Sequence, residues 1–278
     1  MQISQLDIIE KTLVSGIRDF MKDNGFKQAH LGLSGGIDSA LVAYLAVQAA
    51  GAENVTGISM PSRFSSQGSM DDAAELAANL GCRYETIPIE DCYSAFLTAL
   101  KGVFKNLPFG LAEENIQARI RGVLLMAFSN KFGSMLLTTG NKSEVSMGYC
   151  TLYGDTCGAL APIGDIFKTE VFSLCNRINS RLIEAGGRAI IPQATIDKPP
   201  SAELRPGQKD EDSLPPYEVL DAVLKALLCE KKSRDEIIGE GRDAALVDRI
   251  ITTVGKMEFK RRQMPPVIAL SSSLRQVP

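Results

Sequence analysis

Short apolar segments alternate with segments of helical periodicity through the first half of this chain, and this alternation limits the folds available to it. The helical patterns cover 3–21, 39–50, 71–80, 92–104 and 113–131. The strand-like segments cover 29–33, 54–60, 83–87 and 134–141. Strands and helices that alternate at this spacing predict a parallel sheet covered by helices on both faces. We therefore expect an α/β fold built on a doubly wound, mostly parallel sheet.

The second half has a different character. It begins with a glycine-rich segment, 148–165, and it contains six prolines among mixed charges over 192–216. Such a segment predicts a long loop, which we do not expect to pack before a ligand arrives. Further helical patterns lie at 166–185, 217–229, 233–240 and 243–262. We expect one domain over 1–278, in which 1–145 form a nucleotide-binding core and 146–278 form a loop-rich part with extra C-terminal helices.

Composition and charge argue against several classes of protein. The formal net charge is −3, so there is no overall basic footprint for nucleic acid. The longest apolar run, 40–47, is too short to span a membrane, and the first ten residues lack the pattern of a signal peptide. The six cysteines have no regular spacing, which is typical of free thiols in a reducing compartment. We expect a cytoplasmic protein that binds neither nucleic acid nor membranes.

The residue types that remain narrow the chemistry. His30 is the only histidine of the sequence, and we expect it to be packed at the start of the first strand. Ser-His-Asp catalysis is therefore excluded, and chemistry must use carboxylates, lysines, arginines, hydroxyls, the backbone or a metal. Cys150 and Cys157 could form a zinc or redox site, but the remaining zinc ligands are missing.

The segment "LGLSGGIDSA" (31–40) joins the first strand to the next helix. Gly35 and Gly36 allow a tight turn and a close approach of the backbone to a ligand. A helix that begins near Ser39 directs its free N–H groups and its positive dipole end into this turn. Ser34 and Ser39 add hydroxyl donors. These are the features of a phosphate cradle, although the P-loop pattern with its lysine is absent.

Asp38 stands where a P-loop would carry that lysine. An acid beside a polyphosphate makes sense mainly if a divalent cation bridges the two anions. The alternative is that Asp38 or Ser39 simply caps the helix. Two other unusual segments, 60–70 and 138–145, also follow strands. Because ligands of doubly wound sheets bind outside the carboxyl ends of the strands, the sequence favours a ligand site there.

SGGxDS after a first strand resembles the motif of the ATP pyrophosphatase (PP-loop) superfamily, whose members cleave ATP between the α and β phosphates to adenylate a substrate. Four further segments narrow the resemblance: "MPSRFSSQGSMDDAAELAANLG" (60–81), "NIQARIRG" (115–122), "TTGNKSEVSMGYCTLYGD" (138–155) and "FKTEV" (167–171). Together they resemble the synthetase domain of NAD synthetases over almost the whole chain. The form fused to a glutaminase is the most similar.

The resemblance implies ATP-dependent amidation of deamido-NAD (nicotinic acid adenine dinucleotide) to NAD through an adenylate, with release of AMP and pyrophosphate. It also implies Mg²⁺ as cofactor, ATP as co-substrate and a homodimer. The glutaminase domain of the fused form has no counterpart in 1–278, and we expect none before residue 1. We therefore expect the nitrogen to come from free ammonia or from a separate glutaminase subunit.

The resemblance also implies roles for individual residues. Asp38 and Glu144 match metal-binding acids, and Lys168 matches a lysine on the ATP phosphates, so these three are the expected catalytic residues. The residues expected to bind ATP are Gly32, Leu33, Ser34, Gly35, Gly36, Asp38, Ser39, Met60, Arg63, Thr139 and Lys168. Those expected to bind deamido-NAD are Asn115, Arg119, Glu144, Asp155 and Lys260.

Several of these roles have simpler alternatives. Glu144 could supply charge to a first helical turn, and Lys168 could be a solvated lysine that opens a helix. Arg119 shares a helix face with Asn115, which favours it over Arg121 as a phosphate ligand and leaves Arg121 for a surface or an interface. Arg63 could lie in a polar surface loop, Lys260 could pair with a helix end, and Asp155 could position ammonia. Loops 61–70 and 192–216 are expected to order over the substrates.

Two other functions compete with this interpretation. One is another PP-loop amidotransferase or ligase, such as an enzyme resembling GMP synthetase. The other is a sensor that binds ATP without turning it over. A sensor has no need of two carboxylates near the phosphates, so Asp38 and Glu144 together favour an enzyme.

Overall fold

Four parallel strands form the centre of the computed structural model, which describes residues 4–105 and 107–270. They are β1 (Ala29–Gly32), β2 (Val55–Ser59), β3 (Arg83–Thr86) and β4 (Met135–Leu137), and their order in the sheet is β3-β2-β1-β4. Leu31 pairs with Gly57 on one side and with Leu137 on the other. The chain thus adds β2 and β3 on one side of β1 and β4 on the opposite side. The switch point between β1 and β4 is where such sheets bind ligands.

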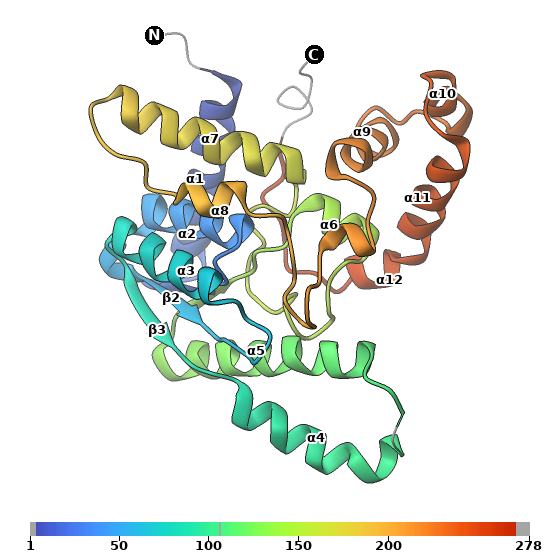
Figure 1. Ribbon diagram of the computed structural model, residues 1–278. Coiled ribbons are helices and arrows are strands. Elements are labelled where there is room, and N and C mark those ends of the chain that lie inside the picture. Colours follow the sequence, from blue (N-terminus) through green and yellow to red (C-terminus); the bar gives the residue numbers. More distant parts are fainter. Residues whose placement is uncertain (1–3, 106, 271–278) are drawn as a thin grey trace.

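Helices cover both faces of the sheet, as the sequence predicted. The elements on one face are α2 (Ile37–Ala50), with α1 (Gln5–Asp23) and α7 (Lys168–Glu184) packed outside it. The other face carries α5 (Leu111–Phe132), with α4 (Glu90–Phe104) beyond it (Figure 1). Because α2 lies between the sheet and a further helical layer, it is buried on most sides, which explains its uniformly apolar sequence. The predicted start of the first helix at Ile3 lies outside the described residues.

The ends of α3 (Gln67–Leu80) follow the expected capping chemistry. Ser66 caps its start by accepting the Ser69 N–H, and Gly81 ends it in the left-handed conformation at φ 69°. The C-terminal stop agrees with the prediction, but the helix begins at Gln67 and not at 71. The loop expected over 61–70 is therefore shorter, because Ser66 supplies a cap.

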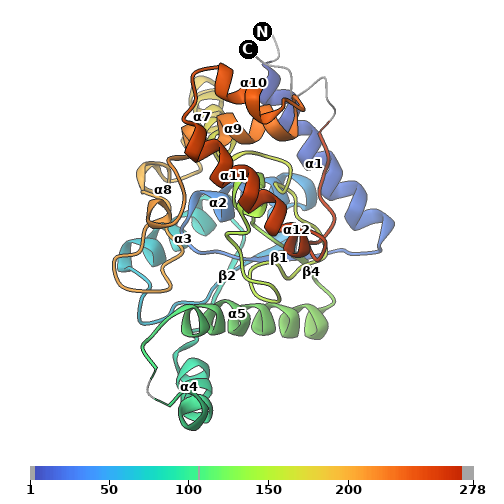
Figure 2. The same ribbon diagram turned by 90° about the vertical axis from the view of Figure 1, so that its right-hand side faces the viewer.

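A second helical group follows β4 and has its own apolar core. Its elements are α6 (Lys142–Met147), α9 (Tyr217–Leu228), α10 (Arg234–Gly239), α11 (Ala244–Lys256) and α12 (Glu258–Arg261). The core of this group includes Leu220, Val247 and Ile250, which are fully buried. The predicted helix over 243–262 is broken at Met257, and α6 was not predicted. Figure 1 shows α9 to α12 on one side of the sheet, and in both Figure 1 and Figure 2 they lie away from α4.

The expectation of an unpacked loop over 192–216 is wrong. This segment contains α8 (Gln193–Asp197) and the 3₁₀ turn η2 (Asp210–Asp212), and hydrogen bonds join it to neighbouring elements. Short turns of this kind lack the apolar periodicity from which helices are predicted.

Three smaller findings concern the expectations from composition. His30 is fully buried, with Nδ1 2.9 Å from Ser134 Oγ and Nε2 3.0 Å from the Leu125 carbonyl oxygen, so it is packed as predicted. All six cysteines are free thiols. Within the described part of the chain, no helix combines the length and apolar character that crossing a membrane requires.

Candidate active site

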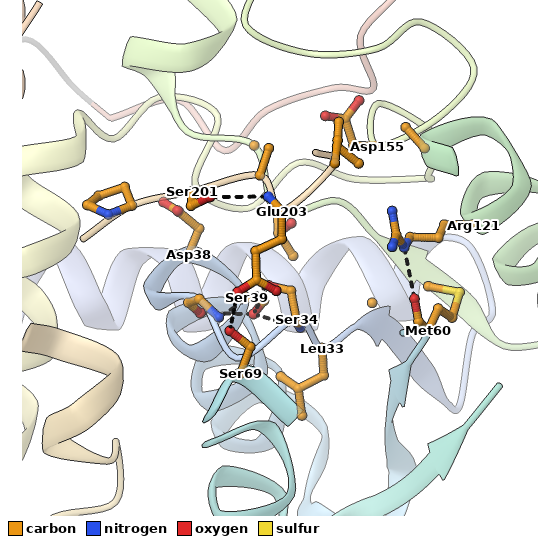
Figure 3. A pocket seen from close by; sticks show the side chains of 18 of the residues that line it. Leu33, Ser34, Asp38, Ser39, Met60, Ser69, Arg121, Asp155, Ser201 and Glu203 are labelled. Carbon is orange, nitrogen blue, oxygen red and sulfur yellow. Dashed lines mark hydrogen bonds between the residues drawn. The ribbon is translucent and has the colours of Figure 1, made fainter. Parts of the chain in front are cut away.

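A pocket of about 630 Å³ opens at the carboxyl ends of β1, β2 and β4. Its size is in the range of sites for small molecules and cofactors. The turn after β1, the ends of β2 and β4, one face of α5 and the segment 198–210 line it (Figure 3). The expected site residues that line it are Gly32, Leu33, Ser34, Gly36, Asp38, Ser39, Met60, Thr139, Glu144, Asp155 and Lys168.

The turn between β1 and α2 has the geometry of an anion cradle. Gly36 is the N-cap of α2 and has no side chain to satisfy the free N–H groups of the first turn. Ser34 Oγ accepts the Gly36 N–H at 3.2 Å, and Ser39 Oγ donates to the Gly36 carbonyl at 2.9 Å. Neither Asp38 nor Ser39 caps the helix, so the simpler explanation of these residues is wrong. The helix N-terminus remains open to a ligand in the pocket.

Gly35 cannot be replaced by another residue without strain. Its φ is +79°, and a Cβ atom built on it would lie 2.1 Å from the carbonyl oxygen of Ser69. The turn therefore packs its backbone directly against the start of α3. The first glycine of the motif is required by this contact, although Gly35 itself does not line the pocket.

Lys168 occupies the centre of the charged part of the site. Its Nζ donates to Asp38 Oδ2 at 2.5 Å and to Glu144 Oε1 at 3.0 Å. Only 3% of its side chain is exposed, which excludes the solvated lysine considered from sequence. Burial alone would lower the pKa of Lys168, but the two carboxylates raise it above its ordinary value. Lys168 is therefore a fixed cation at the bottom of the pocket.

Neighbouring elements hold both carboxylates in place. Asn141 caps α6 by accepting the Glu144 N–H at 3.0 Å, and its amide also donates to Asp38 Oδ1 at 2.9 Å. The turn after β4 thus positions the acid that follows β1. Glu144 does lie in a first helical turn, as one alternative suggested, yet its carboxylate also faces Lys168.

Negative charge exceeds positive charge around Lys168. Burial raises the pKa of Glu144 to about 7, against the attraction of Lys168 and with a contribution from Asp38. Asp210 is also buried; burial raises its pKa, while the hydrogen bond from the Tyr217 hydroxyl, 2.8 Å long, lowers it. Three carboxylates near one ammonium group leave room for further positive charge.

This donor set fits a magnesium ion. Over 4–105 and 107–270, no group of three or more His, Cys, Asp or Glu side chains is arranged to hold a metal. Mg²⁺, however, is usually bound by one or two carboxylates together with substrate phosphates. Asp38 and Glu144 supply two carboxylates that converge on the same point beside the phosphate cradle.

Asp155 lies in the glycine-rich loop, on a different side of the pocket. Its Oδ1 accepts the Thr151 N–H at 2.6 Å, and Asn115 Oδ1 accepts the Thr151 hydroxyl at 2.7 Å. Burial raises the pKa of Asp155 to about 6, against the effect of the Thr151 N–H. The loop can approach α5 closely because a Cβ on Gly122 would lie 2.9 Å from two of its carbonyl oxygens. Asn115 therefore supports the loop and does not itself line the pocket.

The structure reverses the positions predicted for the two arginines of α5: Arg121 lies at the pocket and Arg119 lies at the surface. Arg121 lines the pocket and donates through Nε to the Met60 carbonyl oxygen at 3.0 Å, so its assignment to a surface or interface is wrong. Burial lowers its pKa to about 10. Arg119 is exposed and donates to the Leu152 carbonyl oxygen at 3.2 Å. The difference arises because α5 turns its 118, 121, 122 and 125 face to the pocket.

Two other predicted ligand residues also lie outside the pocket. Arg63 is exposed and pairs with Glu90. Lys260 donates through Nζ to the carbonyl oxygens of Gly148 and Cys150, each at 2.7 Å, which joins α12 to the glycine-rich loop. Their contacts with substrate stay predictions, together with those of Asn115 and Arg119.

Several residues of the site were not identified from the sequence. They are Arg121, Tyr149, Asp210 and the pocket-facing part of the segment 198–210, including Ser201 and Glu203. The acidic group 210–212 was visible as a cluster, but nothing in the sequence indicates that its first member reaches Tyr217. A contact between a loop and a distant helix leaves no periodic signal.

Comparisons with known proteins point to one family of enzymes. Residues 9–265 match the family model described as NAD synthase. A glutamine-dependent NAD(+) synthetase of Synechocystis sp. is 54% identical over 256 residues, which are 92% of this chain and 45% of that protein. The chain thus spans about half the length of the curated relatives it matches.

Two solved structures are similar over nearly their whole length. An NH3-dependent NAD synthetase from Campylobacter jejuni has 30% sequence identity and a TM-score of 0.74, with 94% of this chain and 97% of that chain covered. An NMN synthetase from Francisella tularensis has 29% identity and a TM-score of 0.78, with 97% and 99% covered. From the family match over most of its length and from its close relatives, this chain belongs to the NAD synthase family.

Proposed function

We propose that this chain catalyses the ATP-dependent amidation of deamido-NAD to NAD, with ammonia as nitrogen donor and AMP and pyrophosphate as further products. The observation that carries the proposal is the position of Lys168 between Asp38 and Glu144, beside an open helix N-terminus. Family membership supports ATP-dependent amidation as the general reaction. The pocket takes residues from both 1–145 and 146–278, which supports the proposal that the two parts form one domain.

In the first step, the nicotinate carboxylate attacks the α-phosphorus of ATP, and the bond to pyrophosphate breaks. The N-terminus of α2 and the hydroxyls of Ser34 and Ser39 bind the phosphates. The ammonium group of Lys168 stabilises the charge that develops on the leaving pyrophosphate. Leu33, Met60 and Thr139 line the pocket, and we assign them to contacts with ATP. Arg63 also remains a proposed ATP contact.

Asp38 and Glu144 would hold Mg²⁺, which supplies charge neutralisation on the phosphates when bound. For this role both acids must be ionised. Burial raises the pKa of Glu144 to about 7, while the charge of Lys168 acts in the opposite direction and favours its ionised form. Asn141 orients Asp38 by its amide. These four residues therefore prepare the site before the nucleotide arrives.

In the second step, ammonia attacks the carbonyl carbon of the adenylate, and AMP leaves. Asp155 accepts the proton that an ammonium ion must lose before its nitrogen can attack. A carboxylate with a pKa of about 6 is ionised at neutral pH and still able to take that proton. Arg121 binds an anionic or carbonyl group of a nucleotide on the same side, and Asn115 and Lys260, which both contact the glycine-rich loop, complete the proposed dinucleotide site.

The chain acts as a homodimer in this proposal, and α4 with α5 provides the surface. Large apolar side chains are exposed on these helices, among them Phe96, Val103, Val123 and Phe132. In Figure 1, α4 lies at the edge of the molecule, packed against α5. We place the reaction in the cytoplasm, where the six free thiols stay reduced. A sedimentation experiment that finds monomers at micromolar concentration would contradict the dimer.

The test is steady-state product formation from deamido-NAD and Mg-ATP, with ammonium chloride or glutamine as the single nitrogen source. Formation of NAD with ammonium supports the proposal, and NAD from ammonium but not glutamine leaves room for a separate glutaminase subunit. The mononucleotide nicotinate substrate is tested in parallel, because the Francisella structure is named an NMN synthetase. ATP binding without any pyrophosphate release would favour a sensor and contradict an enzyme.

A further inference from the structure

Residues 198–210, which we name the strap, cross the pocket from α3 to α5. On the α3 side, Lys198 pairs with Asp72 and donates to Ser69 Oγ at 3.1 Å. On the α5 side, the Leu204 carbonyl oxygen accepts from the fully buried Gln117 side chain at 2.9 Å. Eleven residues of the strap line the pocket: 198–205, 207, 208 and 210. A nucleotide in this pocket would therefore lie against the strap over much of its length.

Glu203 joins the strap to the start of α3 by several hydrogen bonds. Its Oε1 accepts from the hydroxyls of Ser66 and Ser69, both at 2.8 Å, and its Oε2 accepts the Ser66 N–H at 3.2 Å. These donors belong to the N-terminal turn of α3, where the helix dipole also favours a negative charge. Figure 3 shows the Glu203 side chain pointing from the strap toward Ser69.

The backbone of Glu203 is strained. Its φ is +50°, in the left-handed region that residues with a Cβ rarely adopt. The Ser201 hydroxyl accepts the Glu203 N–H at 3.2 Å and donates to the Gln208 carbonyl oxygen at 2.6 Å, which holds the turn in shape. Strain of this kind persists where the surrounding contacts require it, and here it directs a carboxylate at α3.

The same part of α3 touches the phosphate cradle. The Ser69 carbonyl oxygen packs on Gly35, and the Ser69 hydroxyl binds Glu203. Ser69 is itself buried, with 5% of its surface exposed. The position of the strap is therefore coupled through one residue to the position of the turn that binds phosphate.

We propose that Glu203 is a positioning residue whose bonds to Ser66 and Ser69 keep the strap closed over the bound adenylate and exclude water from it. The proposal rests on the proposed function and identifies the group that protects its intermediate. When the strap opens too early, water attacks the carbonyl carbon of the adenylate, the bond to AMP breaks, and deamido-NAD is regenerated. Each such event consumes one ATP without forming NAD.

The first test compares Glu203→Gln with Glu211→Gln, which changes an exposed acid in the same segment. The amide keeps the shape of Glu203 but loses its charge and turns an N–H₂ group toward donors of α3. AMP and NAD are measured together at saturating substrates. We expect one AMP per NAD in the wild type and in Glu211→Gln, and at least two in Glu203→Gln. A ratio of one in Glu203→Gln overturns the proposal.

The second test measures strap closure without any turnover. Trypsin can cut the strap after Lys209, because Lys198 and Arg205 each precede a proline. We expect cleavage at Lys209 to be at least fivefold faster in Glu203→Gln than in the wild type, with Glu211→Gln unchanged. Equal cleavage rates in all three proteins overturn the proposal that Glu203 holds the strap closed, whether or not NAD is formed. Absence of NAD in the wild type would instead contradict the proposed function.

A double-mutant cycle separates this role from a general loss of structure. Ser69→Ala removes the hydroxyl that donates to Glu203. The double variant, Ser69→Ala with Glu203→Gln, changes both members of this hydrogen bond. If the two residues act through their shared hydrogen bond, the double variant has an AMP to NAD ratio no higher than that of the more affected single variant. If the increase in the AMP to NAD ratio of the double variant equals the product of the increases in the two single variants, the residues act independently. That result would contradict the proposal that Glu203 holds the strap closed through Ser69.

Discussion

The ammonium nitrogen of Lys168 lies 2.5 Å from Oδ2 of Asp38, although 130 positions separate the two residues in the chain. Asp38 follows β1 and Lys168 opens α7, so their contact joins the sheet to the helix that covers it. The α7 N-terminus is itself fixed, because the Lys168 N–H donates to Ser143 Oγ at 2.9 Å. The charged centre of the site therefore depends on tertiary structure that is complete before substrates bind.

Replacement of Lys168 by methionine removes the cation and keeps a similar volume. Asp38 and Glu144 then face each other without compensation, and the leaving pyrophosphate loses a charged partner. We expect kcat to fall by roughly 100- to 1,000-fold, the usual effect of losing one such group. We also expect a lower Tm at pH 7, with a smaller difference at pH 5, where Glu144 is protonated. Lys256→Met, at an exposed site in α11, is the control, and a kcat near that of the wild type for Lys168→Met would contradict the role.

Replacement of Gly35 by alanine tests the contact between the cradle and α3. The new methyl group would lie 2.1 Å from the Ser69 carbonyl oxygen, and φ is +79°. We expect the left-handed conformation and the clash together to lower the free energy of unfolding by at least about 2 kcal/mol. Gly68→Ala is the matched control, since a Cβ there meets nothing within 4 Å. We expect it to stabilise α3 by up to about 1 kcal/mol. The check is to compare the thermal unfolding of the two variants. Equal stabilities would argue against the close contact between Gly35 and the Ser69 carbonyl.

Arg121 and Arg119 provide a test within one helix. Arg121→Met removes a guanidinium that lines the pocket, whereas Arg119→Met removes an exposed one. A charged hydrogen bond contributes about 1.5–3 kcal/mol, so we expect Arg121→Met to raise the KM of a nucleotide substrate by roughly 10- to 150-fold. We expect less than a threefold change for Arg119→Met. The opposite ranking would restore the assignment made from the sequence.

Much of the fold follows from patterns that the sequence carries locally. The strands, the helix over 71–80 with its Gly81 stop, and the clustering of unusual residues after strands all rest on periodicity or on turn chemistry. Asp38, Glu144 and Lys168, which the structure brings together, were predicted from the resemblance of their motifs to those of NAD synthetases. These features needed no knowledge of distant contacts.

The errors share one physical cause. Arg119 and Arg121 differ by 200° around their helix, and which side faces the pocket depends on how α5 docks against β1 and β4. The strap was expected to be unpacked, since its prolines and charges have no helical or strand period. Its order comes from single hydrogen bonds to α3 and α5, which only the tertiary structure reveals.

Glu144 makes stability depend on pH in a defined direction. Burial raises its pKa from 4.5 to about 7, so the folded protein holds a proton in this interval that the unfolded chain has lost. Stability therefore falls as pH rises from about 4.5 to 7. We expect Glu144→Gln, which cannot ionise, to show a shallower fall in Tm over this range. Some dependence should remain, because burial also raises the pKa of Asp155. An unchanged slope, equal to that of the exposed control Glu75→Gln, would contradict the shift.

Asp155 makes the use of ammonium depend on pH. Its pKa is raised to about 6 by burial, so the carboxylate that must accept a proton is lost below that pH. In the wild type, kcat/KM for ammonium should rise with pH up to about 6 and then level off. Asp155→Asn has no acceptor and must use free ammonia, so its much lower kcat/KM should keep rising above pH 7. Asp91→Asn, at an exposed position of α4, should follow the wild type. A plateau that survives in Asp155→Asn would assign the proton to another group.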